Sequence, residues 1–145
     1  MKLKLLPYSE ITNHELQHTK GYAEADKQLS FVVYDVDNNV ICCAISLVSE
    51  SYDCKFTQDN DLTKGCKILD LAVIKQQGIA HVGYLDKLWE EAKDRCTMWV
   101  DDNGELAFDY IWFNVKDDFA IDIINQYQEE LKMADNGNVI CPLDS

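Results

Sequence analysis

Apolar and charged residues alternate near the start of the chain, over Lys2–Leu6, and Pro7 ends the alternation. A period of two predicts a short β-strand that stops at the proline. Thr12 and Glu15 then have the spacing of a capping box, which predicts a helix. A second helical piece is expected around Tyr22–Gln28, after a glycine.

Two runs of β-branched and aromatic residues follow, Phe31–Val36 and Val40–Val48, on either side of Asp37–Asn39. Asp and Asn tolerate the positive φ angles of a tight turn, so this segment predicts a β-hairpin. Lys67–Ile74 is nearly continuous in its apolar content, which is typical of a central strand.

From Ala80 onward the apolar positions recur with a period of 3.6, which predicts a long amphipathic helix. Strand-like segments follow at Met98–Val100 and Glu105–Val115, around a turn. A second helical stripe covers Phe119–Met133, and Val139–Leu143 reads as a terminal strand. The members of the first stripe are Tyr84, Leu85, Leu88, Trp89, Ala92 and Cys96.

This order of elements predicts an α/β fold: a single mixed, mostly antiparallel sheet flanked by helices on both faces. The 145 residues are expected to form one domain, 1–145. The strand, helix and strand between Lys67 and Val115 are expected to form a right-handed crossover joining two parallel strands.

Asp and Glu outnumber Lys and Arg by 26 to 13, which gives a formal charge of −13. Phosphate contacts need clustered positive charge, so direct nucleic-acid binding is not expected, whereas docking on a basic protein partner is compatible with this charge. No segment is long and apolar enough to cross a membrane, and the first residues do not form a secretory signal. We therefore expect a cytoplasmic protein whose six cysteines are reduced thiols.

The segment Leu69–Val73 and the loop Lys75–Ala80 carry a resemblance to a known family. The loop reads Lys-Gln-Gln-Gly-Ile-Ala and is similar to the coenzyme loop Q/R-x-x-G-x-G/A of the GNAT acetyltransferase superfamily, with Lys75 in its first position. The hairpin at Phe31–Val48 resembles the second and third strands of that fold, and Leu69–Val73 resembles the fourth. The resemblance implies a GNAT-like fold.

The same resemblance implies that acetyl-CoA donates an acyl group to an amine of a small molecule or protein. In the family the pantetheine arm bonds the backbone of the fourth strand, which assigns Leu71 and Val73. The loop residues Lys75, Gln77, Gly78, Ile79 and Ala80 would hold the diphosphate, because glycine lets phosphate approach the unpaired amides that open a helix.

Two catalytic roles follow from this reading. A tyrosine in the region of the last helix serves the family as the acid for the leaving thiolate, and Tyr127 is the available residue. A carboxylate near the splayed end of the fourth and fifth strands can act as the base. Asp70 and Asp109 border those strands, and Asp70 is assigned the role.

Two other functions remain open. The string His14-Glu15-Leu-Gln-His18 has the H-E-x-x-H spacing of zinc peptidases, in which two histidines bind zinc and the glutamate is the base. In such enzymes a sheet precedes the active helix, and the segment before His14 is too short to form one. No metal site is therefore assigned. The other alternative is a non-catalytic acidic binding or inhibitor protein. Such a protein would dock on a basic partner by mimicking the charge of a nucleic acid.

Overall fold

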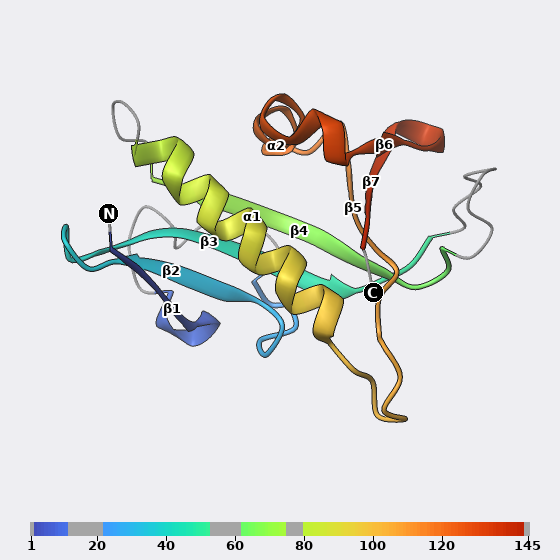
Figure 1. Ribbon diagram of the computed structural model, residues 1–145, viewed down its shortest axis with the longest axis horizontal. Helices are drawn as coiled ribbons and strands as arrows, with labels where there is room; N and C mark the ends of the chain where they lie inside the picture. The colour runs from blue at the N-terminus through green and yellow to red at the C-terminus, as the bar shows by residue number, and fades with distance from the viewer. Residues whose placement is uncertain (1, 12–21, 53–61, 75–79, 144–145) are drawn as a thin grey trace. The chain divides into compact units, whose positions relative to one another are not determined.

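The computed structural model describes residues 2–11, 22–52, 62–74 and 80–143 (Figure 1). It is an α/β structure with a seven-stranded mixed sheet in the order β1-β2-β3-β4-β5-β7-β6. The strands and α-helices are β1 (Leu3–Pro7), β2 (Phe31–Asp35), β3 (Val40–Ser49), β4 (Gly65–Val73), α1 (Ala80–Met98), β5 (Tyr110–Asn114), α2 (Ala120–Tyr127), β6 (Lys132–Met133) and β7 (Asn138–Pro142). Short 3₁₀ turns cover Tyr8–Glu10, Gln128–Glu130 and Asp135–Gly137.

The chain divides into two compact units. The first comprises Met1–Val48 and Leu69–Ala92, and the second comprises Ser49–Ile68 and Lys93–Ser145. The described residues contain two α-helices and do not show the helices on both faces of the sheet that the sequence predicts. The helix expected from Thr12 lies outside the described residues.

Strand pairing is antiparallel from β1 to β2 and from β2 to β3, and also from β5 to β7 and from β7 to β6. The exception is β4, which pairs with β5 in parallel, with Gly65 opposite Tyr110 and Lys67 opposite Trp112. The predicted hairpin is confirmed, and Asn39 supplies the positive φ of its turn, 52°. The predicted parallel arrangement of the strands before and after α1 is also confirmed.

The core of the first unit is built by α1 against β2 and β3 (Figure 1). Tyr84, Leu88 and Trp89 are fully buried, and the whole stripe predicted for this helix is buried. The Cys43 thiol donates to the carbonyl of Tyr84 at 3.6 Å, which ties β3 to the helix backbone. In the described part of the chain, no helix is long and apolar enough to span a membrane.

One buried polar pair joins α1 to β2. The Tyr84 hydroxyl donates to a carboxylate oxygen of Asp35 at 2.5 Å, and the Asn38 side-chain amide donates to the same oxygen at 2.7 Å. The bond from Tyr84, followed by that from Asn38, lowers the pKa of Asp35. Burial, with the bond to Asp35 as the next cause, raises the pKa of Tyr84 to about 12.

The second unit contains a close contact where β4 begins. A Cβ atom added to Gly65 would lie 2.7 Å from the Tyr110 ring, a distance that real Cβ atoms do not show. Tyr110 is fully buried, and its cluster includes Trp112, Ile140 and the half-buried Tyr52. Glycine at position 65 therefore lets the Tyr110 ring pack directly on the β4 backbone.

Three elements differ from the sequence prediction. Residues 22–29 form turns instead of a helical piece, because the Asp26 carboxylate accepts the amides of Gln28 and Leu29. The last helix ends at Tyr127, not at Met133, because Lys132–Met133 pairs with β7 as an edge strand.

The third difference concerns the strand-like segments around the turn at residues 101–104. They are reduced to a single bridge between Val100 and Leu106, and β5 begins only at Tyr110. Both bridge residues are exposed, so no burial of apolar surface stabilises a longer hairpin.

The Asp35–Tyr84 pair predicts how stability changes with pH. The pKa of Asp35 is lowered on folding, so its contribution is present at neutral pH and is lost as the pH falls through its folded pKa. The pKa of Tyr84 is raised from 10.0 to about 12, so its contribution is complete below pH 10 and is lost as the pH rises toward 12. Urea unfolding across these two ranges measures both effects.

Tyr84→Phe is the matching variant, expected to lower the free energy of unfolding by about 1–3 kcal/mol because it leaves a buried carboxylate with fewer donors. Its acid unfolding should begin at higher pH than that of the wild type. Tyr34→Phe is the control, because the Tyr34 hydroxyl bonds Asn39 at an exposed position, and it should change the stability by about 0.5 kcal/mol or less. Equal losses in both variants would contradict the importance of the buried pair.

A second prediction concerns Gly65. Gly65→Ala should lower the free energy of unfolding by about 1–3 kcal/mol, because the added methyl group must displace the Tyr110 ring. Chemical denaturation measures the loss. In a Tyr110→Leu background the same substitution should cost less, since the ring atoms in contact are gone; an unchanged cost would show that the close contact is not the cause.

Candidate functional site

The C-terminal half of β4 is the first candidate site. β4 lies between β3 and β5 in the strand order, and its register pairs with β5 extend from Gly65 to Lys67. The strand continues past these pairs to Val73, and the amide of Ile74 donates to the carbonyl of Cys42 on β3 at 2.8 Å. Leu71 is buried and Val73 is half-buried. The strand is thus held to β3 well beyond its last pair with β5.

The residues expected to hold the diphosphate follow this strand. Lys75, Gln77, Gly78 and Ile79 lie outside the described residues. Ala80 is the first residue of α1. Their assignment to a coenzyme loop stays a prediction.

Asp70 lies on β4 within electrostatic range of a buried hydroxyl pair in the first unit. Tyr8, in the 3₁₀ turn after β1, is fully buried, and its hydroxyl hydrogen-bonds the buried Ser46 hydroxyl on β3. Burial is the main reason that the pKa of Tyr8 is raised; the bond to Ser46 acts in the opposite direction, and the charge of Asp70 raises the pKa further. The half-buried Asp70 carboxylate therefore lies within electrostatic reach of a neutral Tyr8 hydroxyl.

A cation and a second aromatic ring adjoin this cluster. The rings of Tyr8 and Tyr22 stack with centroids 5.2 Å apart. The Lys27 ammonium lies 4.3 Å from the centroid of the Tyr22 ring and donates to the carbonyl of Ala25 at 3.2 Å. The contact with the Tyr22 ring and the bonds to the carbonyls of Ala25 and Tyr22 fix the position of the Lys27 ammonium, so its charge has a structural role.

Asp109, the other carboxylate considered as a base, has a structural role in the second unit. Its side chain accepts the amide of Thr63 at 3.0 Å and the amide of Lys64 at 2.9 Å, and its own amide donates to the carbonyl of Lys64 at 2.7 Å. These bonds attach the segment before β4 to the segment before β5.

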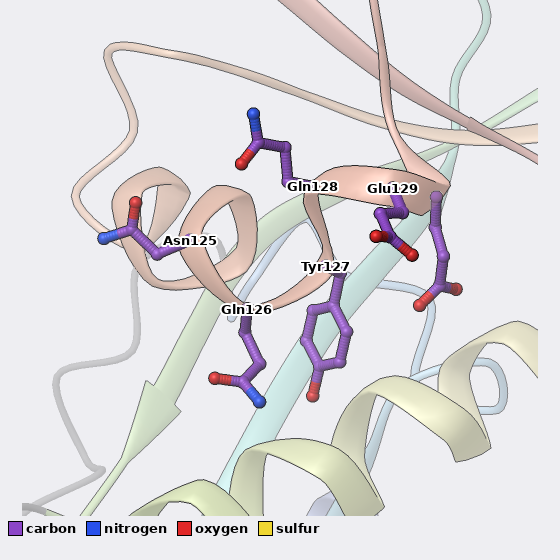
Figure 2. Close-up of a pocket in the computed structure, with 6 residues that line it drawn as sticks. Asn125, Gln126, Tyr127, Gln128 and Glu129 are labelled. Carbon is purple, nitrogen blue, oxygen red and sulfur yellow. The ribbon is translucent and has the colours of Figure 1, made fainter.

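Tyr127 is the last residue of α2 and is buried. It borders a hollow of about 300 Å³ lined by residues 125–130, and Figure 2 shows its ring directed away from the side chains of Asn125 and Gln128. The lining is polar and includes Glu129 and Glu130, the second of which pairs with Lys93. A hollow with acidic walls is unsuited to an anionic ligand, so it is not the phosphate site.

Thiol and metal chemistry receive no support from the described part of the chain. Cys42, Cys43, Cys66, Cys96 and Cys141 are buried thiols, and burial raises the pKa of Cys43. A group of three or more metal-ligating side chains is not found among these residues. His14, Glu15 and His18 lie outside them, so the zinc hypothesis stays a prediction.

Sequence reasoning missed the buried hydroxyl pair of Tyr8 and Ser46. Ser46 is the single hydroxyl residue among the buried residues of β3, and a buried polar side chain needs a partner. That signal points to a buried hydrogen bond but does not identify Tyr8, which is 38 residues away in sequence.

Comparison with known proteins adds no family. The sequence matches no model of a protein family, and a search of curated proteins finds no significant match. The function must therefore be argued from the residues and their geometry.

The structural role of Asp109 yields a prediction. Asp109→Ala should lower the free energy of unfolding by about 1–3 kcal/mol, because the amides of Thr63 and Lys64 lose their acceptor. Urea denaturation measures the loss. Asp102→Ala, at an exposed position, is the control and should stay within about 0.5 kcal/mol of the wild type. The assignment is wrong if both variants are equally stable.

Proposed function

We propose that the protein is a GNAT-like N-acyltransferase that binds acetyl-CoA along β4 and transfers the acyl group to an amine. The observation that carries the proposal is the extent of β4. Its register pairs with β5 end at Lys67, while the strand continues to Val73 and is followed by α1 from Ala80. An extended pantetheine arm can bond such a backbone in the manner of an added strand.

The sequence order of the elements also supports the proposal. A first strand, a hairpin, the β4 segment, a helix, a parallel strand, a second helix and a final strand occur in the order that carries the family resemblance. Strand β4 lies between β3 and β5 in the strand order, so an added strand would bond it on the side that faces β5, beyond Lys67. Residues Lys75 to Ile79 would supply the amides and the one cation for the diphosphate.

The chemistry assigns one proton transfer to each of two side chains. The amine nitrogen of the acceptor forms a bond to the thioester carbonyl carbon, and the carbon–sulfur bond breaks. The Asp70 carboxylate, in the first unit, takes the proton released by the nitrogen. The departing thiolate takes a proton from a general acid, and the family resemblance gives this role to the Tyr127 hydroxyl, in the second unit. The products are an amide and free coenzyme A.

Asp70 suits the role of base because of its surroundings. It immediately precedes Leu71, one of the two positions proposed for the pantetheine arm, and it is half-buried, with its charge raising the pKa of Tyr8. A partly desolvated carboxylate attracts the ammonium form of an acceptor and then accepts its proton.

Binding and turnover test the proposal separately. Calorimetry of the full chain with acetyl-CoA should give a saturable heat, and the amides of Leu71 and Val73 should show the largest nuclear magnetic resonance shifts on β4. With an amine acceptor, Asp70→Asn should lower kcat by about a hundredfold or more while the affinity for acetyl-CoA is kept. Tyr127→Phe should also lower kcat without weakening the binding.

Asp109→Asn is the matched control for Asp70→Asn, because it makes the same chemical change at a carboxylate that holds backbone amides. It should reduce stability and leave kcat unchanged at a temperature where the variant is folded. Absence of heat at millimolar acetyl-CoA would exclude the proposed function. Equal activity of the Asp70→Asn variant and the wild type would exclude Asp70 as the base.

A further inference from the structure

Three exposed apolar side chains occur close in sequence, at the end of α1 and in the segment that links it to β5, within the second unit, and two of them, Val100 and Leu106, are paired in a β-bridge. Met98 is 71% exposed, Val100 is 56% exposed and Leu106 is 42% exposed. They make up three of the seven large hydrophobic residues that the described part of the chain exposes. We call residues 98–106 the exposed hairpin; Figure 1 shows it as an excursion of the chain between α1 and β5.

The exposed hairpin has a defined conformation. Val100 and Leu106 form an antiparallel bridge, and the amide of Asp101 donates to the carbonyl of Glu105 at 2.8 Å. The Asp101 carboxylate accepts the amides of Asn103 and Glu105 at 2.9 and 3.0 Å. These bonds hold the turn while its apolar side chains remain exposed, so a partner would find a preorganised surface.

The charge of this segment is uniformly negative. Residues 97–109 contain four acids, and no Lys, Arg or His occurs among them. Asp101 and Asp109 hold backbone amides, whereas Asp102 and Glu105 are exposed beside the apolar side chains. Lys64 donates to the carbonyl of Leu106 at 2.7 Å, which places one cation at the base of the hairpin.

We propose that the exposed hairpin is a docking surface for a protein partner that presents an apolar pocket ringed by lysine or arginine. The apolar side chains supply the buried contacts, and Asp102 and Glu105 supply the charge complementarity. The same charge disfavours other occupants: a second copy of a chain with a formal charge of −13, a nucleic acid and an anionic membrane are all repelled. The inference does not depend on acetyl-CoA binding.

Selection from a library of random short peptides on the immobilised full chain tests the inference. Binders are counter-selected on the variant Met98→Ser/Val100→Ser/Leu106→Ser, whose substitutions affect only exposed side chains. Lys- or Arg-rich peptides with an apolar pair should be enriched. A synthetic enriched peptide should bind the wild type about tenfold or more tightly than the triple variant.

The two components of recognition can be separated with further variants. Asp102→Asn/Glu105→Gln should weaken binding of the enriched peptide and reduce its dependence on salt. Ile121→Ser, which removes a 61% exposed side chain from α2, is the control and should bind as the wild type does. Amide shifts on adding the peptide should be confined to the exposed hairpin and its neighbours.

Several results would overturn the inference. These are enrichment of peptides that lack basic residues, equal affinity for the wild type and the triple variant, and self-association of the wild type that the triple variant loses. Binding of the wild type to vesicles of phosphatidylserine and phosphatidylcholine, lost in the triple variant, would assign the hairpin to a membrane instead.

Discussion

The packing of the Tyr110 ring on the backbone of Gly65 fixes the point where β4 and β5 come together. Any side chain at position 65 would occupy the space of that ring, so the parallel pairing begins at a glycine. The Tyr110 hydroxyl lies 3.3 Å from both the amide and the carbonyl oxygen of Tyr52, which connects the same ring to the chain that follows β3. Parallel pairing then extends only to Lys67. Because the rest of β4 is stabilised by β3, the strand remains extended without needing β5 along its whole length.

The acidic composition has a local explanation in much of this fold. Many aspartates accept backbone amides at turns and strand ends, where a carboxylate supplies the acceptor that the backbone lacks. Charge alone is therefore weak evidence for a partner, and only acids without such a role bear on recognition. The aspartates that hold amides in this way are Asp26, Asp35, Asp37, Asp101, Asp109 and Asp117.

Sequence periodicity predicted the elements whose pattern and contacts agree. The stripe of α1 was predictable because its apolar positions lie on one face, and the hairpin of β2 and β3 because both strands are rich in β-branched and aromatic residues on either side of a turn segment. The end of α2 was not, because the pairing of Met133 with Val139 outweighs the helical spacing that continues to Leu131. The buried hydroxyl pair was also not predictable. Its partners come from distant segments, and only the fold brings Tyr8 to Ser46.

Long-range electrostatics constrains the proposed reaction. Coenzyme A carries several negative charges, and a chain with a formal charge of −13 repels it at a distance. Affinity must then come from short-range contacts, namely backbone bonds between the pantetheine arm and β4 and the amides at the start of α1. The same field attracts a cationic acceptor, because an amine approaches as ammonium and Asp70 lies beside the proposed pantetheine positions. In the proposed reaction the charge that opposes coenzyme binding therefore favours the second substrate, and a basic acceptor would suit this surface better than an acidic one.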